Sequence, residues 1–306
     1  MRAAHCSDSG ISLEACARLA CNAAVLHALQ PRTSSVLAEL SYVDPTSKRP
    51  VQYAYEPPDG ESWESCRHES RAVRIADARA LVPGSSVHAE GFELRDAPSA
   101  VTDFLDEDEI TGVYYGEAAE LALAATGARH AYVFDHLVRK RETGRPALDF
   151  GRSAGGKPSA NGRIHNDYTE ESGRRRLGLV LTDPRAAAAV GRYAIVNIWR
   201  SIKGPVLDTP LAVCDARSVS AADLVVGEVR YPDRTGEIYL LRHSRRHRWF
   251  YYPAMDRHEA LVFKQYDSQV SGVSRYTPHA AFDHPDTPAD APLRESVEVR
   301  CLVVYE

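Results

Sequence analysis

Two histidines and one aspartate have the residue types of a metal site. His165 and Asp167 are separated by a single residue, and His279 follows later in the chain. Alternate side chains of an extended segment point to the same face, so His165 and Asp167 can reach one ion. Two imidazoles and one carboxylate are the ligands of Fe(II) sites that leave positions open for substrate and oxygen. We therefore expect His165, Asp167 and His279 to be the metal ligands and the catalytic residues.

The third ligand has to be chosen among the five histidines that follow Asp167, which are His243, His247, His258, His279 and His284. Only His279 is followed, after about fifteen residues, by an Arg-x-Ser sequence, Arg294-x-Ser296, that leads into the final apolar stretch. We therefore choose His279. His247 is the reserve candidate because it lies beside the aromatic segment 249–252, although the start of a strand on a basic turn explains it better.

A His-x-Asp pair is weak on its own, since the chain contains a second one, His284 and Asp286. This second pair has no histidine after it. It lies in a segment rich in proline and aspartate, where turn formation explains both residues. We therefore expect that His284 does not bind the metal.

Arg294 and Ser296 suggest how a dicarboxylate could be bound beside the metal. A guanidinium matches a carboxylate with two parallel hydrogen bonds and keeps its charge when partly buried. Arg294, Ser296 and Arg300 share a face of one predicted strand, so either arginine could bind the far carboxylate of 2-oxoglutarate. Ser296 favours Arg294, and a salt bridge to Glu298 explains Arg300 better. Beside an Fe(II) site with open positions, this set predicts 2-oxoglutarate as cosubstrate and O2 as oxidant.

The composition is that of an ordinary globular protein. The 306 residues carry a net charge of −5, so neither nucleic acid nor an anionic membrane is expected as the main partner. The three arginines at 174–176 are typical of a solvated surface. The six cysteines form no C-x-x-C pair, which argues against a zinc site and a disulfide framework. Reduced thiols and the lack of a membrane-spanning apolar run predict a cytoplasmic protein.

The elements that must position these residues are mostly short strands. Apolar or alternating runs occupy 131–134, 177–181, 194–199, 238–241, 249–252, 260–263 and 297–305. The clearest helix begins near Asp106 or Asp108, keeps helical apolar spacing and ends at Gly127. Helices gather in the first half and strands in the second, and no nucleotide-binding glycine loop is present. This favours a mainly β protein with flanking helices and a double-stranded β-helix core, of the jelly-roll or cupin-like kind.

The chain divides at about residue 35. Residues 1–34 contain a fairly apolar stretch, 11–29, which charged and polar residues interrupt, so it is a poor signal peptide. We expect a helical or disordered N-terminal extension at 1–34 and a single oxygenase domain at 35–306. Its double-stranded β-helix core should span about 130 to 306. The segment 149–161, rich in small residues, is expected to form a loop before His165.

Several segments of the chain are similar to one group of oxygenases. They are His165-Asn166-Asp167 and the segments 196–200, 210–215, 247–252 and 261–268, with 91–94 and Tyr114-Tyr115 also fitting. The group resembles the hydroxylase component of cephamycin 7α-methoxylation and the fungal gibberellin-desaturase-like proteins. The similarity runs from about Ser35 to Glu306.

The resemblance implies a double-stranded β-helix, Fe(II), 2-oxoglutarate and a specialised metabolite as substrate. It supports His165 and Asp167, and His279, Arg294 and Ser296 match the broader pattern of 2-oxoglutarate oxygenases. The best expectation is 7α-hydroxylation of a cephem in cephamycin-type antibiotic biosynthesis, with a separate methyltransferase as partner protein. Hydroxylation or desaturation of another natural product is the alternative.

Four residues near the expected barrel mouth are candidate substrate contacts, and they are Arg163, Asn197, Trp199 and Arg200. A carboxylate on a β-lactam would favour an arginine among them, although a structural role explains each at least as well. Two other functions stay open: a non-catalytic accessory partner of a methyltransferase, and a cupin enzyme that uses its metal without 2-oxoglutarate. An intact Arg-x-Ser clamp argues for turnover, because a scaffold has no need of a cosubstrate pocket.

Overall fold

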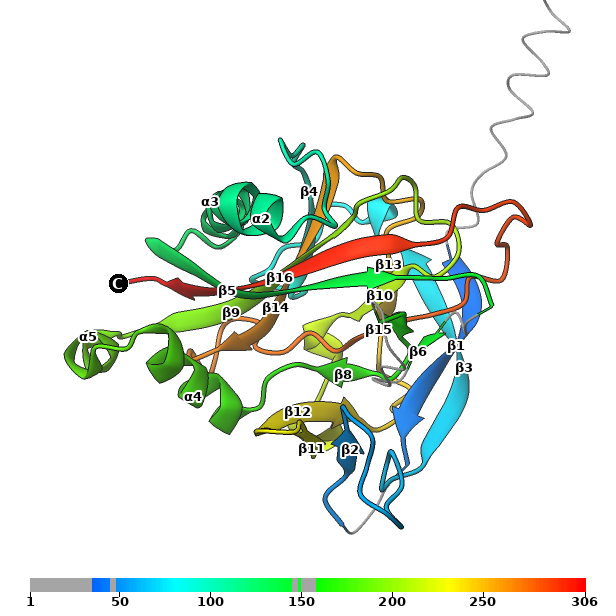
Figure 1. The fold of residues 1–306 in the computed structure, drawn as a ribbon, viewed down its shortest axis with the longest axis horizontal. Helices are drawn as coiled ribbons and strands as arrows, with labels where there is room; N and C mark the ends of the chain where they lie inside the picture. The colour runs from blue at the N-terminus through cyan, green and yellow to red at the C-terminus, as the bar shows by residue number, and fades with distance from the viewer. Residues whose placement is uncertain (1–34, 45–47, 145–147, 150–157) are drawn as a thin grey trace, which may run out of the picture. The chain divides into compact units, whose positions relative to one another are not determined.

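The structure, a computed structural model, describes residues 35–44, 48–144, 148–149 and 158–306. The expected N-terminal extension lies outside the described residues, as does most of the expected loop before His165. Within the described part, most residues of regular structure are in strands, and two curved sheets form a jelly-roll core (Figure 1). The predicted mainly β fold class is confirmed.

The first sheet has nine strands in the order β1-β3-β13-β10-β15-β8-β12-β11-β2. Their bounds are β1 Ser35–Val43, β2 Val51–Tyr53, β3 His68–Asp77, β8 His165–Asn166, β10 Leu211–Cys214, β11 Leu224–Arg230, β12 Thr235–Leu241, β13 Trp249–Tyr251 and β15 His279–Ala281. Strands from the beginning of the described chain, β1 and β3, extend this sheet by pairing with β13. The sheet therefore includes strands that lie before residue 130.

The second sheet has five strands in the order β4-β14-β9-β16-β5. Their bounds are β4 Phe92–Asp96, β5 His130–Lys140, β9 Tyr193–Ser201, β14 Glu259–Asp267 and β16 Glu295–Val304. The short strands β6 (Leu148–Asp149) and β7 (Ala160–Asn161) form a separate pair. The apolar runs predicted at 194–199, 238–241, 249–252, 260–263 and 297–305 fall on strands, except for Tyr252 and Tyr305, each one residue past the end of its strand.

The alternation of β16 separates the core of the protein from its site. Val297, Val299 and Cys301 are buried in a cluster that includes Ala118 and Ala122 of helix α3 (Tyr115–Thr126). Since side chains alternate along a strand, Ser296, Glu298 and Arg300 point to the other face, toward the nine-stranded sheet. One strand thus contributes both to the apolar core and to the space between the sheets.

The predicted helix before Gly127 is confirmed, with one difference. It begins as α2 (Glu107–Glu109), where the Asp106 side chain accepts hydrogen bonds from two main-chain amides, passes through a π-helical turn at Ile110–Tyr114, and continues as α3. Gly127 ends it in the left-handed conformation, with φ of 68°, which glycine adopts without steric cost. The remaining short helical turns are Ala78–Ala80, Ala216–Ser218 and Ala221–Asp223.

The apolar run 177–181, predicted as a strand, belongs instead to helix α4 (Glu170–Val180), and α5 (Pro184–Ala189) follows it. Thr169 caps α4 with a capping box, since its hydroxyl accepts from the Ser172 amide and the Ser172 hydroxyl accepts from the Thr169 amide. The apolar spacing alone fits either a strand or a helix, and the capping box favours the helix. Helices are therefore not confined to the first half of the chain.

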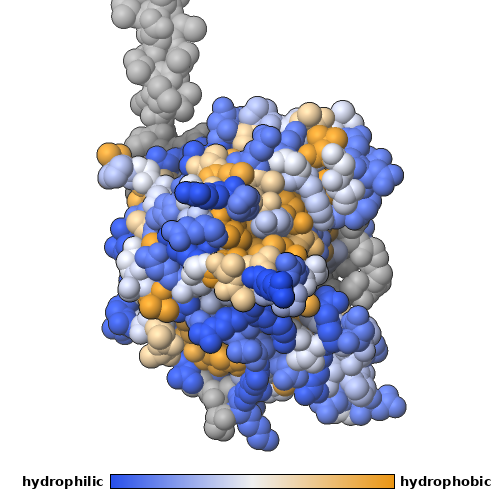
Figure 2. Space-filling view, turned by 90° about the vertical axis from the view of Figure 1, so that its left-hand side faces the viewer, coloured by the Kyte–Doolittle hydropathy of each residue, from blue (hydrophilic) through white to orange (hydrophobic). Residues whose placement is uncertain are grey.

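One face of the molecule, on the side that carries α4 and α5 in Figure 1, has hydrophobic residues set among hydrophilic ones (Figure 2). Among the described residues, no helix combines the length and the apolar character that a membrane span needs. Three of the six cysteines fall in the described part, namely Cys66, Cys214 and Cys301, and all three are free thiols. For these three, the prediction of reduced cysteines agrees with the structure.

Gly173 offers a test of how α4 is seated. A Cβ at this position would lie 2.6 Å from the ring of Tyr266, which is buried, whereas a Cβ at Gly178 on the same helix would meet nothing within 4 Å. We expect Gly173→Ala to lower the free energy of unfolding by about 1–3 kcal/mol through overpacking. Gly178→Ala should raise it by about 0.5–1 kcal/mol through helix propensity. Urea unfolding of both variants measures this, and equal effects would contradict the close packing.

Candidate metal centre and adjoining pocket

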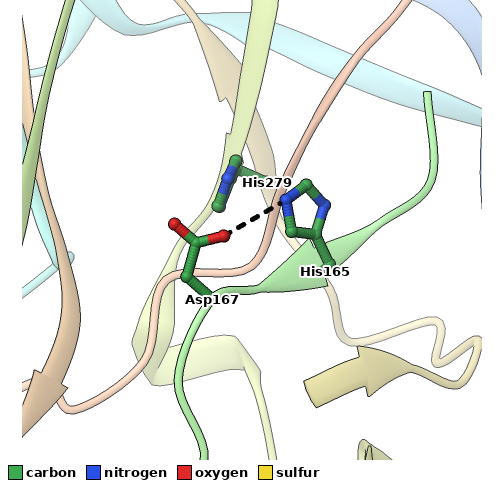
Figure 3. Close-up of side chains that lie close together, drawn as sticks. All are labelled: His165, Asp167 and His279. Atoms are coloured by element: carbon green, nitrogen blue, oxygen red, sulfur yellow. Dashed lines mark ion pairs between the residues drawn. The ribbon is translucent and has the colours of Figure 1, made fainter. Parts of the chain in front are cut away.

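The three predicted metal ligands lie together between the sheets (Figure 3). His165 on β8 and His279 on β15 are direct partners in an antiparallel ladder, and their ring centroids are 4.4 Å apart. Asp167 follows β8, and its Oδ1 lies 3.4 Å from Nε2 of His165. One donor atom from each residue lies within 4.8 Å of the others. The structure thus brings His165, Asp167 and His279 together as the sequence predicts.

Both imidazoles are held in a tautomer that leaves Nε2 free for a metal. Nδ1 of His165 is 2.8 Å from the main-chain oxygen of Arg163, and Nδ1 of His279 is 3.2 Å from that of Thr277. A carbonyl oxygen can only accept, so each Nδ1 carries the hydrogen and each Nε2 keeps a free lone pair. Metal-binding histidines are oriented by this kind of second contact. The donor set therefore fits a divalent transition metal.

The charges around the cluster favour the same protonation states. Nδ2 of Asn197 and Nε of Arg300 donate to Oδ2 of Asp167, at 2.8 and 3.1 Å. Burial opposes ionisation, but Arg300 and the neighbouring histidines outweigh it and hold the pKa of Asp167 well below its usual range. Burial, with the adjacent His165, lowers the pKa of His279 to about 3. A carboxylate beside a neutral imidazole is the state that binds metal.

Asn166, between His165 and Asp167, fixes the segment from the opposite face. Its side-chain amide donates to the main-chain oxygens of Tyr168 (2.8 Å) and Gln265 (2.9 Å) and accepts from the amide of Thr277 (3.0 Å). The Gln265 side chain in turn accepts from the Asp167 amide at 2.8 Å. Sequence reasoning missed these two positioning residues. The available signal was the alternation, which points a polar Asn166 away from the metal and into the protein.

Arg294 and Ser296 lie together close to the metal cluster. Nε and Nη2 of Arg294 donate to the Ser296 hydroxyl at 3.3 and 3.2 Å, and Nη1 donates to the main-chain oxygen of Thr209 at 2.6 Å. The guanidinium lies over the Trp199 ring, 5.0 Å from its centroid. Arg294 is buried, and no carboxylate of the described residues forms an ion pair with its guanidinium.

Burial without a partner anion has an electrostatic consequence. Loss of solvent, followed by the nearby charge of Arg139, lowers the pKa of Arg294 to about 9. The Nε1 of Trp199 is also buried and finds no hydrogen-bond acceptor among the described residues. A buried cation and an unused donor side by side fit a small anionic ligand that carries oxygen acceptors.

A cavity of about 430 Å³ joins the metal cluster to Arg294. Its lining includes the three cluster residues together with Arg139, Trp199, Arg294, Glu298 and Arg300. Trp199 is the predicted substrate contact that lines this cavity. Asn197 instead supports Asp167, and Arg300 also binds Asp135 and Glu298, at 2.8 and 2.9 Å, so its guanidinium is already occupied by carboxylates.

Two of the predicted substrate contacts, Arg163 and Arg200, do not line the cavity. Arg163 binds Glu64 through two nitrogens, at 3.1 and 2.7 Å, and the Ser41 hydroxyl at 2.7 Å. Arg200 differs from Trp199 by one residue on β9, so it points to the opposite face, where its Nε donates to the Tyr114 hydroxyl at 2.8 Å. Both arginines thus contact other protein groups, and the substrate role expected for them stays a prediction.

The other histidines considered lie elsewhere. His247 stacks on Tyr42 and lies 3.4 Å from Asp223, and His284 lies 3.1 Å from the Tyr251 hydroxyl. Neither joins the cluster of His165, Asp167 and His279, the one group of three or more potential ligands in the described part of the chain. The sequence argument and the geometry therefore select the same third ligand, His279.

Known proteins resemble this chain over most of its length. A family model for an oxidoreductase/YMDC permease-like domain matches residues 40–304. The hydroxylase/desaturase CTB9 of Cercospora beticola is 33% identical over 259 residues, which is 78% of each chain. The Fe(II)/2-oxoglutarate-dependent dioxygenase nvfI of Aspergillus novofumigatus is 30% identical over 275 residues, covering 87% of this chain and 95% of the relative.

The fold is shared with a solved structure as well. The iron and alpha-ketoglutarate-dependent endoperoxidase NvfI superposes on this chain with a TM-score of 0.79 at 25% identity, covering 89% of this chain and 99% of the other. Sequence and fold thus point to the same group of proteins.

Proposed function

We propose that this chain, which belongs to the Fe(II)/2-oxoglutarate-dependent dioxygenases, oxidises an unactivated C–H bond of a specialised metabolite. The observation that carries the proposal is the juxtaposition of two features in one cavity: the cluster of His165, Asp167 and His279, and a buried Arg294 that has no carboxylate partner. A scaffold without turnover would have no use for the second feature.

In this proposal His165, Asp167 and His279 hold Fe(II) through Nε2, a carboxylate oxygen and Nε2. Arg294 and Ser296 hold the far carboxylate of 2-oxoglutarate. Bound iron and 2-oxoglutarate together supply the oxidising power to activate O2 against a strong C–H bond. Arg300 acts as a positioning residue, since its contact with Asp167 keeps that carboxylate ionised and oriented.

The remaining residues of the cavity orient reactants and limit water. Trp199 covers Arg294, so a carboxylate bound there would exchange hydrogen bonds in a largely dry environment, where each is stronger than in water. Its free Nε1–H is available to a ligand oxygen. The side-chain amide of Asn197 donates a hydrogen bond to Asp167, so Asn197 has a structural role in the site.

For the organic substrate we propose a cephem, hydroxylated at its 7α position before a separate methyltransferase methylates the product. The support is the similarity of the segments 165–167, 196–200 and 247–252 to the hydroxylase component of cephamycin 7α-methoxylation. The alternative is hydroxylation or desaturation of another natural product, which the name of the relative CTB9, a hydroxylase/desaturase, favours.

The clamp is tested by replacing Arg294. In anaerobic calorimetry with Fe(II), Arg294→Gln should weaken 2-oxoglutarate binding about 100-fold, because a charge-assisted pair of hydrogen bonds is lost. Arg294→Lys should weaken it about tenfold, since it keeps the charge and loses the planar fork. Ser296→Ala should have the smallest effect. An affinity that does not change in Arg294→Gln would contradict the assignment and move the clamp elsewhere.

The acceptor is tested by succinate release. Cephalosporin C should raise the release of succinate above the rate without acceptor and gain one oxygen atom in mass spectrometry. A product that has lost two hydrogen atoms would indicate desaturation. No rise with the cephem, together with a rise for a terpenoid or polyketide panel, would contradict the cephem while retaining the oxygenase.

A further inference from the structure

A second cavity, of about 390 Å³, adjoins the first. The two share part of their lining, including Asp167, Arg300 and Ile238. A molecule that fills the second cavity would therefore extend toward the metal cluster. The lining that only the second cavity has comes from Tyr168, from helix α4 and from the first residues of β12.

The acidic residues of this second cavity are already neutralised. Asp135 and Asp167 both accept from Arg300, at 2.8 and 3.1 Å. Glu237 forms an ion pair with Arg49 and accepts from the Thr169 hydroxyl at 2.9 Å. No carboxylate of the lining is left without a cation or a donor.

Two arginines of α4 that line the same cavity have no such partner. Arg175 and Arg176 form no ion pair with a carboxylate of the described residues, whereas Arg174 next to them pairs with Glu170 at 3.0 Å. The Arg176 guanidinium packs over the Phe134 ring, 4.7 Å from its centroid, and its Nε is buried without a hydrogen-bond partner. The cavity thus has an excess of positive charge on one wall.

The arginines are carried by a fixed support. The Thr169 and Ser172 side chains at the start of α4 bond to Glu237 of β12, the latter through the main-chain oxygen at 3.1 Å. Gly173 packs directly against the Tyr266 ring. This contact fixes the position of α4, which contributes Arg175 and Arg176 to the lining of the cavity.

The remaining lining has an apolar or aromatic part, made by Tyr168, Leu179, Val229, Tyr231 and Ile238, and a further cation, Arg234, which pairs with Asp233 at 3.6 Å. Such a wall suits the hydrocarbon body of a small molecule, while a few polar groups fix its orientation. An arginine pair in the same lining suits an anionic group at one end of the molecule.

We propose that the second cavity binds a carboxylate of the organic substrate, with Arg175 and Arg176 as its cationic partners. The proposal rests on the proposed function, since it places the organic substrate beside the metal cluster. The sequence alone predicts a solvated surface for the arginines at 174–176, and the proposal gives two of them a binding role. The arginines that contact the substrate carboxylate are then on α4, in place of Arg163 and Arg200.

The test uses the anaerobic Fe(II) protein saturated with 2-oxoglutarate, so that Arg294 is not free to take up a second acid. Calorimetry compares biphenyl-4-carboxylate with biphenyl-4-carboxamide, which have the same shape and differ in charge. The acid should bind about tenfold more tightly than the amide. Arg176→Gln should abolish this preference and leave the affinity for the amide unchanged.

Two further variants keep the test decisive. Arg175→Gln, at an exposed position, should weaken binding of the acid alone, and Arg174→Gln should change neither affinity. Equal affinities for acid and amide in the intact protein, including no binding of either, would overturn the proposal. So would a loss of both probes together in Arg175→Gln. The titration of 2-oxoglutarate that precedes the probes reports on the proposed function separately.

Discussion

The direct pairing of His165 with His279 across β8 and β15 is the constraint on which the site depends. These two short strands lie in the middle of the nine-stranded sheet, and their register places both imidazoles on the face toward the second sheet. A shift by one residue would turn Asn166 inward and both His165 and Asp167 outward. The hydrogen bonds of Asn166 to the neighbouring segments oppose that shift, so the backbone network and the metal site require the same register.

Charge is distributed unevenly across the cavity, and the distribution separates the roles of its arginines. Arg300 is surrounded by Asp135, Asp167 and Glu298 and serves the carboxylate of the cluster. Arg294, six residues earlier in the chain, has only a hydroxyl and a carbonyl as partners. A buried cation without an anion is unfavourable. An anionic group of a ligand would therefore be a favourable partner for the Arg294 guanidinium.

The sequence sufficed for features that depend on local pattern. The spacing of His165 and Asp167, and the alternation of Ser296, Glu298 and Arg300, follow from two-residue periodicity, and the structure repeats both. It did not suffice where long-range packing decides. Arg163 is drawn to Glu64, and Arg200 to Tyr114, by partners distant in the chain. The run 177–181 is too short to distinguish a strand from a helix by its apolar pattern. The capping box at Thr169 favours the helix, and the prediction did not include it.

The central claim, that one cavity holds Fe(II) and 2-oxoglutarate together, is tested most directly by anaerobic absorption spectroscopy. Added in sequence to the metal-free protein, Fe(II) and 2-oxoglutarate should together give a weak visible band that neither gives alone. The band should persist in His258→Ala, an exposed histidine, and vanish in His279→Ala. A spectrum of the intact protein that does not change on addition of 2-oxoglutarate, or a band that survives in His279→Ala, would contradict the claim.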